Sequence, residues 1–361
     1  LEDPNVASKE HLVRQYDHEV QAGSVIKPFC GSRADGPSDG AVLKPLFYSS
    51  RGITVTHGIC PRYGDIDTYH MARCALDEAL RAHVACGGDP DTAAALDNFC
   101  WPDPVVSEQT PDGAYKLAQL VRACRGLYDS CREYGIPLIS GKDSMKNDAR
   151  LGSRKVSVRP TLLISLIGVM PDIEKAVSTD FKRPGDAIFI LGETRGELGG
   201  TAFESADGRL YDTVPKTDIE KSMRLYRALH QAVCAGLVAS CHDLSDGGLA
   251  VAAAESAFGG RVGAEIDIGP VPVPAGRFLE PSRILFCETP GRFIVSAAEE
   301  NTAAFSNMMK GSAFARIGTV SRRVKPAGSG RVVFRSGGSV CIDCRLEAIE
   351  ERWKSLERKL R

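Results

Sequence analysis

Long hydrophobic runs are missing from this 361-residue chain. The nearest candidate, residues 162–170, has the length of a strand, whereas a helix that crosses a membrane needs about 20 apolar residues. The first residues also lack the charged and apolar pattern of a secretory signal. We therefore expect a cytoplasmic protein with no membrane partner. The chain begins without Met, so we also expect a piece of a longer protein.

A charge excess of one sign is absent as well. The 45 Lys and Arg residues balance 46 Asp and Glu residues, which leaves a net charge of −1. A nucleic-acid partner would favour a basic balance, so none is expected. The densest charged run, residues 345–361, is typical of a solvated helix face.

Paired metal-ligand motifs are also lacking. Twelve cysteines are scattered along the chain, and the one CxxC, Cys341 to Cys344, has no second ligand pair after it. A structural zinc site needs four ligands at characteristic spacings. We expect reduced thiols that pack as small apolar groups.

The composition and length that are present fit a globular protein with two domains. Strand and helix patterns interleave without strict βαβ order, which predicts an α/β (α+β) fold. We expect an N-terminal helix and linker over 1–40, a first domain over 41–175, a second over 176–345 and a charged helix over 346–361. The N-terminal helix itself is expected over 5–22.

The clearest helices are predicted over 67–86, ended by a Gly pair, and over 112–134, ended by Gly135. A strand over 136–139 then leads into a loop at 140–144. In the second half a strand over 238–241 leads into 242–248, followed by a helix over 249–258.

The first candidate site is Ser140-Gly141-Lys142-Asp143-Ser144. Gly141 permits close backbone approach, Lys142 supplies a cation, Asp143 a metal ligand and Ser144 a hydroxyl. These groups could hold a phosphorylated ligand with magnesium, although the Walker spacing is absent. An ordinary polar turn is an equally good reading of these five residues alone.

The second candidate is the run from His242 to Gly248, which enters a helix. Asp243 at the strand end is the better metal-ligand candidate, and Asp246 is expected to cap the helix. His242 is expected to pack or to donate a hydrogen bond. Ser245 lies between the two carboxylates.

Two further acidic residues and one arginine are of interest. Asp97 at a strand end suits the rim of a ligand site or an Asx-turn. Glu78 falls on the apolar face of a helix, so it needs a bound cation or a buried partner. Arg62, just before that helix, could contact an anion, or its loop could simply cap the helix.

Together these motifs resemble one family. Residues 15–20, Asn98, 141–145 and 242–248, in this order, resemble the second half of formylglycinamide ribonucleotide amidotransferase, also called phosphoribosylformylglycinamidine synthase. The resemblance runs from about residue 5 to about residue 342. In that family two halves each resemble aminoimidazole ribonucleotide synthetase.

The resemblance implies an architecture and a reaction. The N-terminal domain of each half, here 41–175, would bind nucleotide and pair with its counterpart to close a β-barrel. An α/β domain would follow over 176–345. The reaction uses ATP and Mg2+ to phosphorylate the amide of formylglycinamide ribonucleotide, and ammonia from a glutaminase then displaces the phosphate. The implied partners are the first half of the synthetase, a glutaminase and the ribonucleotide substrate.

The resemblance also implies residue roles. Asp97, Gly141 and Lys142 would contact ATP, Ser144 the substrate, and Asp143 would take over the metal that an Asn binds where Lys142 stands. Glu78 and Asp243 would hold an auxiliary metal and Ser245 an auxiliary nucleotide. Ala82 and His57 replace expected polar ligands. The catalytic His and the ATP-binding Lys and Glu lie in the first half, so no catalytic residue is expected here and the isolated chain should be inactive.

Two alternatives remain. The chain could be a non-catalytic nucleotide-binding or scaffold half, which Ala82, His57 and Lys142 favour. It could also be a relative of selenophosphate or thiamine-monophosphate kinase type, although residues 38–41 are a poor match to their nucleotide loop. A half that evolved to pair exposes a sheet edge or an apolar face, so a homodimer is a further expectation.

Overall fold

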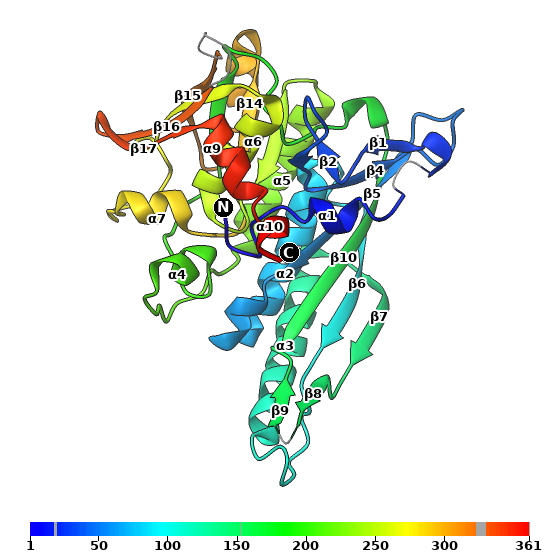
Figure 1. The fold of residues 1–361 in the computed structure, drawn as a ribbon. Helices are drawn as coiled ribbons and strands as arrows, with labels where there is room; N and C mark the ends of the chain where they lie inside the picture. The colour runs from blue at the N-terminus through cyan, green and yellow to red at the C-terminus, as the bar shows by residue number, and fades with distance from the viewer. Residues whose placement is uncertain (18–19, 153, 323–329, 361) are drawn as a thin grey trace.

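Two β-sheets, one from each part of the chain, organise the molecule (Figure 1). The computed structural model describes residues 1–17, 20–152, 154–322 and 330–360. Helices and strands interleave in both parts, which confirms the α/β class. Among the described residues, no helix is long and apolar enough to cross a membrane.

The first sheet has six strands in the order β1-β4-β5-β10-β6-β7. β7 runs parallel to β6, and the other neighbouring pairs are antiparallel. The strands are β1 (Ser24–Ile26), β4 (Gly40–Leu43), β5 (Gly52–Ile59), β6 (Ala93–Cys100), β7 (Leu138–Ser144) and β10 (Thr161–Met170).

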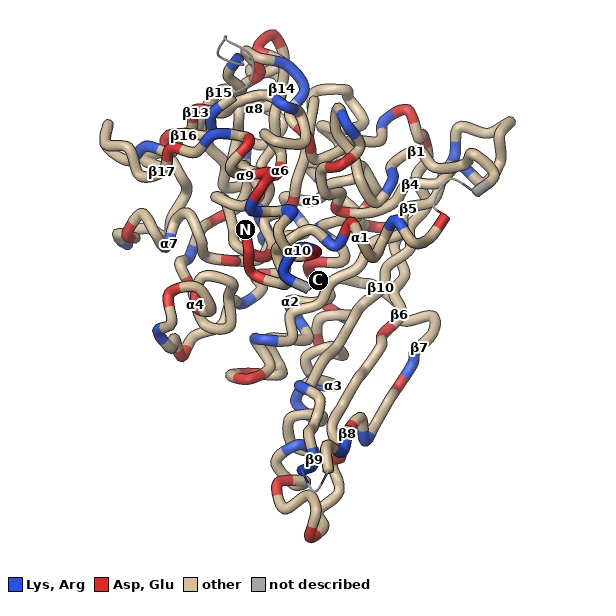
Figure 2. Tube along the Cα trace, viewed as in Figure 1, with Lys and Arg blue, Asp and Glu red and all other residues tan. Residues whose placement is uncertain are grey.

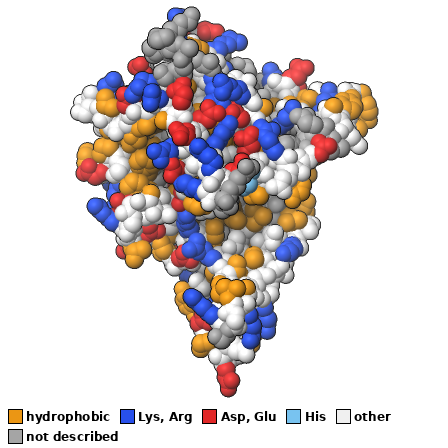
Figure 3. Space-filling view, in the orientation of Figure 1, with side chains coloured by type: hydrophobic (Ala, Val, Ile, Leu, Met, Phe, Trp, Pro, Cys, Tyr) orange, Lys and Arg blue, Asp and Glu red, His pale blue; other side chains and the backbone are white. Residues whose placement is uncertain are grey.

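Two long helices cover one face of this sheet, α2 (Thr68–Ala85) and α3 (Gly113–Tyr134) (Figure 1). Alternation along β5 and β10 buries one face against them and leaves the other open. The open face carries exposed Val55, Ile167 and Val169. In Figure 3 hydrophobic side chains gather over this part of β10 and β6. An apolar sheet face without cover suits a partner surface.

The second sheet has seven strands in the order β12-β14-β11-β15-β13-β16-β17. They are β11 (Ala187–Leu191), β12 (Ser240–Asp243), β13 (Gly263–Asp267), β14 (Phe293–Ala297), β15 (Phe314–Ser321), β16 (Arg331–Ser336) and β17 (Ser339–Arg345). Both faces of its centre are buried. Phe189 and Val295 pack with α5 (Ile219–Cys234), whereas Ile188 and Ile190 pack with α6 (Gly248–Gly260).

The α5 side of the second sheet shares one core with the α2–α3 layer of the first. The two domains therefore meet through buried apolar contact. The shorter described elements are α1 (Glu10–Val13), η1 (Val20–Ala22), β2 (Phe29–Cys30), β3 (Gly36–Pro37), η2 (Pro61–Asp65), β8 (Asp148–Leu151), β9 (Arg154–Ser157), η3 (Ile173–Lys175), α4 (Ala202–Asp207), α7 (Pro281–Phe286), η4 (Glu299–Asn301), α8 (Thr302–Met308), α9 (Leu346–Trp353) and α10 (Leu356–Leu360).

The predicted long helices are confirmed with their caps. The Asp67 side chain accepts the N–H groups of Tyr69 and His70, and Gly135 ends α3 in the left-handed region. The N-terminal helix over 5–22 is wrong, because Val6 packs instead on Ala202 of the second domain, and the described residues there form only the four-residue helix α1 and the 3-10 turn η1. Part of that prediction, residues 18–19, lies outside the described residues.

The C-terminal run is wrong as one solvated helix. It forms two short helices, and Ile349 and Trp353 of α9 are buried against α6. Basic and acidic residues are interspersed along the chain, as the balanced composition predicts (Figure 2).

Candidate functional site

Residues 140–144 form a strand, not a loop. They are the second part of β7, an exposed edge strand that pairs only with β6. Pairing with β6 is a tertiary effect that local sequence did not reveal. Because a strand alternates, it places Gly141 and Asp143 on the helix-facing side and Lys142 and Ser144 on the open side.

On the helix-facing side, Gly141 lies opposite Asp97 in the register. A Cβ at residue 141 would lie 2.8 Å from Asp97 Oδ1, so a side chain there would displace the carboxylate. Burial and then the nearby Asp143 raise the pKa of Asp97 above its usual range. The two carboxylates therefore repel each other across an edge that could take a cation.

On the open side, the Lys142 ammonium donates to the Ser144 hydroxyl. Lys142 is exposed and Ser144 is half-buried. Both lie beside the apolar open face, facing the space that a partner would cover. The geometry thus divides the five residues between two sides of one strand.

The second group lies where α2 meets the second domain. Arg81 is fully buried and donates to Asp77 of its own helix and, at 3.0 Å, to Asp243 Oδ2 of β12. Two tyrosines from α3 and α5, Tyr134 and Tyr226, also donate to Asp77. The Arg81 pKa is held well above its usual range by Asp243 and Asp77, despite burial that lowers it.

His242, next to Asp243, lies between two carboxylates. Its Nδ1 is 2.6 Å from Asp39 Oδ1 and its Nε2 is 3.1 Å from Glu255 Oε2. Burial alone would lower the His242 pKa, but Asp39 and Glu255 raise it well above its usual range. The ring thus lies within ion-pair distance of both carboxylates, and the contact of its Nε2 with Glu255 agrees with the hydrogen-bonding role predicted for it.

Glu78 has the partner that its position requires. Its Oε2 accepts the Ile59 N–H at 2.9 Å and lies 3.4 Å from Cys60 Sγ. Burial and then Asp243 raise the Glu78 pKa to about 8. Ser245 Oγ lies 3.5 Å from Asp243 Oδ1, so Glu78, Asp243 and Ser245 belong to one neighbourhood.

Asp246 is not the helix cap that was expected. Gly247, with φ of 80°, takes the N-cap position of α6 without a side-chain hydrogen bond. Asp246 instead lines a cavity of about 640 Å³ between the open end of β5, the N-terminal segment and the second domain. Away from the cavity, protein surrounds the Asp246 carboxylate and keeps water from it. This desolvation raises the Asp246 pKa to about 6.

The sequence assigned no role in this region to three of its residues. Asp77 and Arg81 stand four apart on a predicted helix, which is the spacing of a helical ion pair and could have revealed them. Asp39 was considered only as part of a weak nucleotide loop. Its contact with His242 joins residues 203 apart in sequence, and no local signal predicts it.

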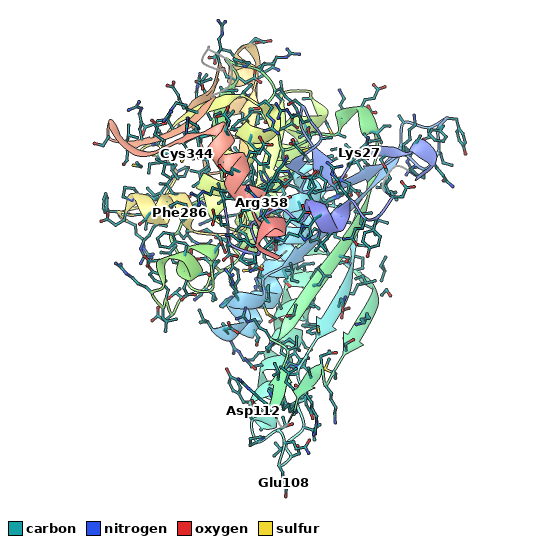
Figure 4. The ribbon with its side chains drawn as sticks, in the orientation of Figure 1. Lys27, Glu108, Asp112, Phe286, Cys344 and Arg358 are labelled. Carbon is teal, nitrogen blue, oxygen red and sulfur yellow. The ribbon has the colours of Figure 1, made fainter. Side chains whose placement is uncertain are left out.

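The structure also shows the loop of Arg62 and the CxxC motif. Arg62 lines the same cavity and pairs with Asp3 at 2.9 Å, while Asp67 caps α2. Cys341 and Cys344 are exposed and free on the outer strand β17, far from the arm that carries Glu108 and Asp112 (Figure 4). Extended chain holds residues three apart at about 10 Å, too far for a disulfide.

The two regions differ in how they fit a metal ion. Asp97 and Asp143 are carboxylates at an exposed edge that make no ion pair within the described part of the chain, and carboxylate oxygens suit Mg2+. In the second region Asp39, His242 and Asp243 bring their ligand atoms within 4.8 Å of one another. There, however, Arg81 already pairs with Asp243, the His242 ring already lies 2.6 Å from Asp39, and Ala82 offers no ligand. The described residues of this second region fit Mg2+ poorly.

Comparison with known proteins now places the fold. Residues 37–170 match the family model described as AIR synthase related protein, N-terminal domain, and residues 183–329 match the corresponding C-terminal domain. The chain belongs to the AIR synthase-related family. The matched segments contain five of the six strands of the first sheet and five of the seven strands of the second, and β1, β16 and β17 lie outside them.

Two similar proteins are subunits with the same name. The phosphoribosylformylglycinamidine synthase subunit PurL of Alkaliphilus metalliredigens is 32% identical over 357 residues, covering 98% of this chain and 44% of that protein. The Thermoplasma acidophilum subunit is 28% identical, with 97% and 43% covered. The chain thus spans less than half the length of these relatives.

Solved structures agree on the fold. T. maritima PurL complexed with FGAR has a TM-score of 0.66 at 18% identity, over 90% of this chain and 50% of that one. T. maritima PurL complexed with ATP has a TM-score of 0.64, also at 18% identity, over 95% and 51%. The hydrogenase maturation protein HypE in complex with ATP has a TM-score of 0.58 at 18% identity, over 84% and 86%. The overlap with HypE thus covers most of both chains.

Proposed function

We propose that this chain is one of the two AIR synthase-like halves of a phosphoribosylformylglycinamidine synthase. The whole enzyme would convert formylglycinamide ribonucleotide, ATP and ammonia to formylglycinamidine ribonucleotide. The observation that carries the proposal is edge strand β7, which presents Lys142 and Ser144 beside an apolar face without cover. This surface would form one side of a ligand cleft, and the companion half would form the other side.

The roles follow from the two sides of β7. The Ser144 hydroxyl would hydrogen-bond the ribonucleotide, and the Lys142 ammonium would neutralise negative charge on the phosphoryl group in transfer. Asp97 and Gly141 would contact ATP. Mg2+ bound with ATP would neutralise its phosphates, and Asp143 offers a carboxylate at that edge. The companion first half would supply the catalytic His.

Partners are part of the proposal. A companion AIR synthase-like half would cover the open sheet face, and the roughly double length of the PurL relatives supports it. A glutaminase would supply the ammonia. The location would be cytoplasmic, in keeping with twelve free cysteines.

The test is a product assay with ATP, ribonucleotide and ammonium salt. The isolated chain is expected to give no product, and addition of the companion half should restore turnover. In that complex Ser144→Ala should raise the KM for the ribonucleotide about tenfold and leave the KM for ATP unchanged. Turnover by the isolated chain, or a Ser144→Ala complex with unchanged kinetics, would contradict the proposal.

A scaffold half without nucleotide is the second candidate. The pairing of Arg81 with Asp243 favours it for the interdomain region, because this internal cation takes the place of a metal ion. The auxiliary roles of Glu78, Asp243 and Ser245 therefore remain the weaker part of the proposal. Calorimetric titration of the two-half complex with ATP and Mg2+ distinguishes the two candidates. If no heat of binding is measured, only the scaffold function remains.

A further inference from the structure

The short link between β7 and the β8–β9 hairpin, Met145 to Asn147, begins directly after Ser144 (Figure 1). We call this link the β7–β8 turn. Ser144 is the residue proposed to contact the ribonucleotide. The end of an edge strand frays unless further bonds hold it, so the position of the Ser144 hydroxyl depends on this turn.

Asn147 closes the turn with its side chain. Its Nδ2 donates to the Ser144 carbonyl oxygen at 2.6 Å. The same carbonyl accepts the Trp101 N–H at 2.8 Å. The Ser144 carbonyl therefore has two donors, one from across the sheet and one from the turn. Together they fix the backbone that carries the Ser144 hydroxyl.

Asn147 is itself anchored through its backbone. Its N–H donates to the Trp101 carbonyl at 3.0 Å, and its carbonyl accepts the Val158 N–H at 3.1 Å. Trp101 is fully buried, and its indole N–H donates to the Lys116 carbonyl of α3 at 3.0 Å. Asn147 thus joins the ends of β6 and β7 to the segment that precedes β10, and α3 holds this junction in place.

The backbone of the turn passes through the left-handed region. Lys146 has a φ of 60°, which a residue with a side chain adopts at a cost in free energy. Its carbonyl accepts the Asp148 N–H at 2.9 Å. Such strain persists only where the surrounding structure imposes it, and it clusters at ligand sites. The path of the chain after Ser144 is therefore imposed by the bonds of the turn.

We propose that Asn147 is a positioning residue for the ribonucleotide. Through the Ser144 carbonyl it fixes the direction in which the Ser144 hydroxyl meets the substrate. This inference rests on the proposed function and adds to it a residue that acts without touching the substrate. Asn147 would not affect ATP, because Asp97 and Gly141 pair with each other three residues before Ser144 along the β6–β7 ladder.

The test is a double-mutant cycle in the two-half complex, with the KM for each substrate as the readout. Asn147→Ala removes the donor and should raise the KM for the ribonucleotide about fivefold, with kcat and the KM for ATP unchanged. Added to Ser144→Ala, the same change should have no further effect, because the hydroxyl that Asn147 positions is already gone. Asn147→Asp has the same size but cannot donate, so it should raise this KM at least as much.

A second pair of variants tests the turn without changing Asn147. Lys146→Gly and Lys146→Val lose the same charge, but glycine adopts a positive φ freely and valine resists it. The KM for the ribonucleotide should be about threefold higher in Lys146→Val than in Lys146→Gly. Asn307→Ala, at an exposed position of α8 in the second domain, is the control and should leave every constant unchanged.

The KM for ATP reports on folding in the same assay. An equal rise of both KM values in Asn147→Ala would overturn the inference, because Asn147 would then support the whole strand edge. Additive effects of Asn147→Ala and Ser144→Ala on the KM for the ribonucleotide would overturn it as well. Either result leaves the proposed function standing, since the wild-type complex still turns over. A wild-type complex that gives no product overturns both.

Discussion

At the scale of single residues, His83 shows how a buried titratable group can be held neutral. Its Nδ1 lies 2.5 Å from the Thr54 hydroxyl and its Nε2 lies 3.0 Å from the Asp89 carbonyl. This pattern fits a neutral ring that accepts from Thr54 and donates to Asp89. Gly88 and Gly168 lie so close that a Cβ on either would come within 2.3 Å of the ring.

His83 predicts a pH dependence of stability. Burial lowers its pKa from 6.5 to about 4, so the unfolded chain binds this proton more readily than the folded one. The contribution of His83 to the free energy of unfolding is complete above pH 6.5. It falls by about 3 kcal/mol as the pH drops from 6.5 toward 4. Urea unfolding across this range checks it, with His83→Gln as control: the gap in unfolding free energy between the two proteins should shrink on acidification. Parallel curves would rule the explanation out.

At the scale of elements, the interdomain ion network decides how α2 sits against the second domain. Asp77 and Arg81 come from α2, Tyr226 from α5 and Asp243 from β12. All four are buried, so each charge depends on the others for compensation. Loss of one charge leaves its partners buried and unpaired.

Arg81→Met is therefore expected to destabilise the chain by about 3–5 kcal/mol. Arg224→Met is the matched control, because Arg224 pairs only with exposed Glu220 four residues before it and should cost less than about 0.5 kcal/mol. Thermal unfolding measures both. Equal, small losses would show that the network is not required for the docking of α2.

Element prediction from the sequence succeeded where local signals suffice. The Asp67 cap and Gly135 set the ends of α2 and α3 through their own hydrogen bonds and backbone angles. The prediction failed at residues 140–144 of β7, which were expected as a loop and are extended because they pair with β6. It also failed at residues 5–9, which were expected as a helix and lie against the second domain. In the site, the resemblance assigned Asp97 and Gly141 to one ligand, and the structure places them opposite each other on β6 and β7, whereas the Asp39 contact required the fold.

At the scale of the molecule, the two domains share a continuous core, yet one face of the first sheet has no cover. On that face Ile167 and Val169 are 40% and 39% exposed, and Val55 is 41% exposed. Burial of apolar surface stabilises association by about 25 cal/mol per Å² before its entropic costs. A second copy of the chain is the partner at hand when the companion half is absent.

The isolated chain is accordingly expected to self-associate, in a concentration-dependent way, through the open face. Ile167→Asp places a charge at its centre and should shift sedimentation-equilibrium profiles to monomer, because an unpaired carboxylate is costly to bury in an interface. The side chain points away from α2, so the melting temperature should hold. Val106→Asp, an exposed loop position away from the sheet, should leave the profiles unchanged. A wild-type chain that stays monomeric at every concentration would contradict self-association. An Ile167→Asp chain that still associates would mean that another surface is used. If Ile167→Asp is monomeric and also fails to bind the companion half, both contacts belong to the same face.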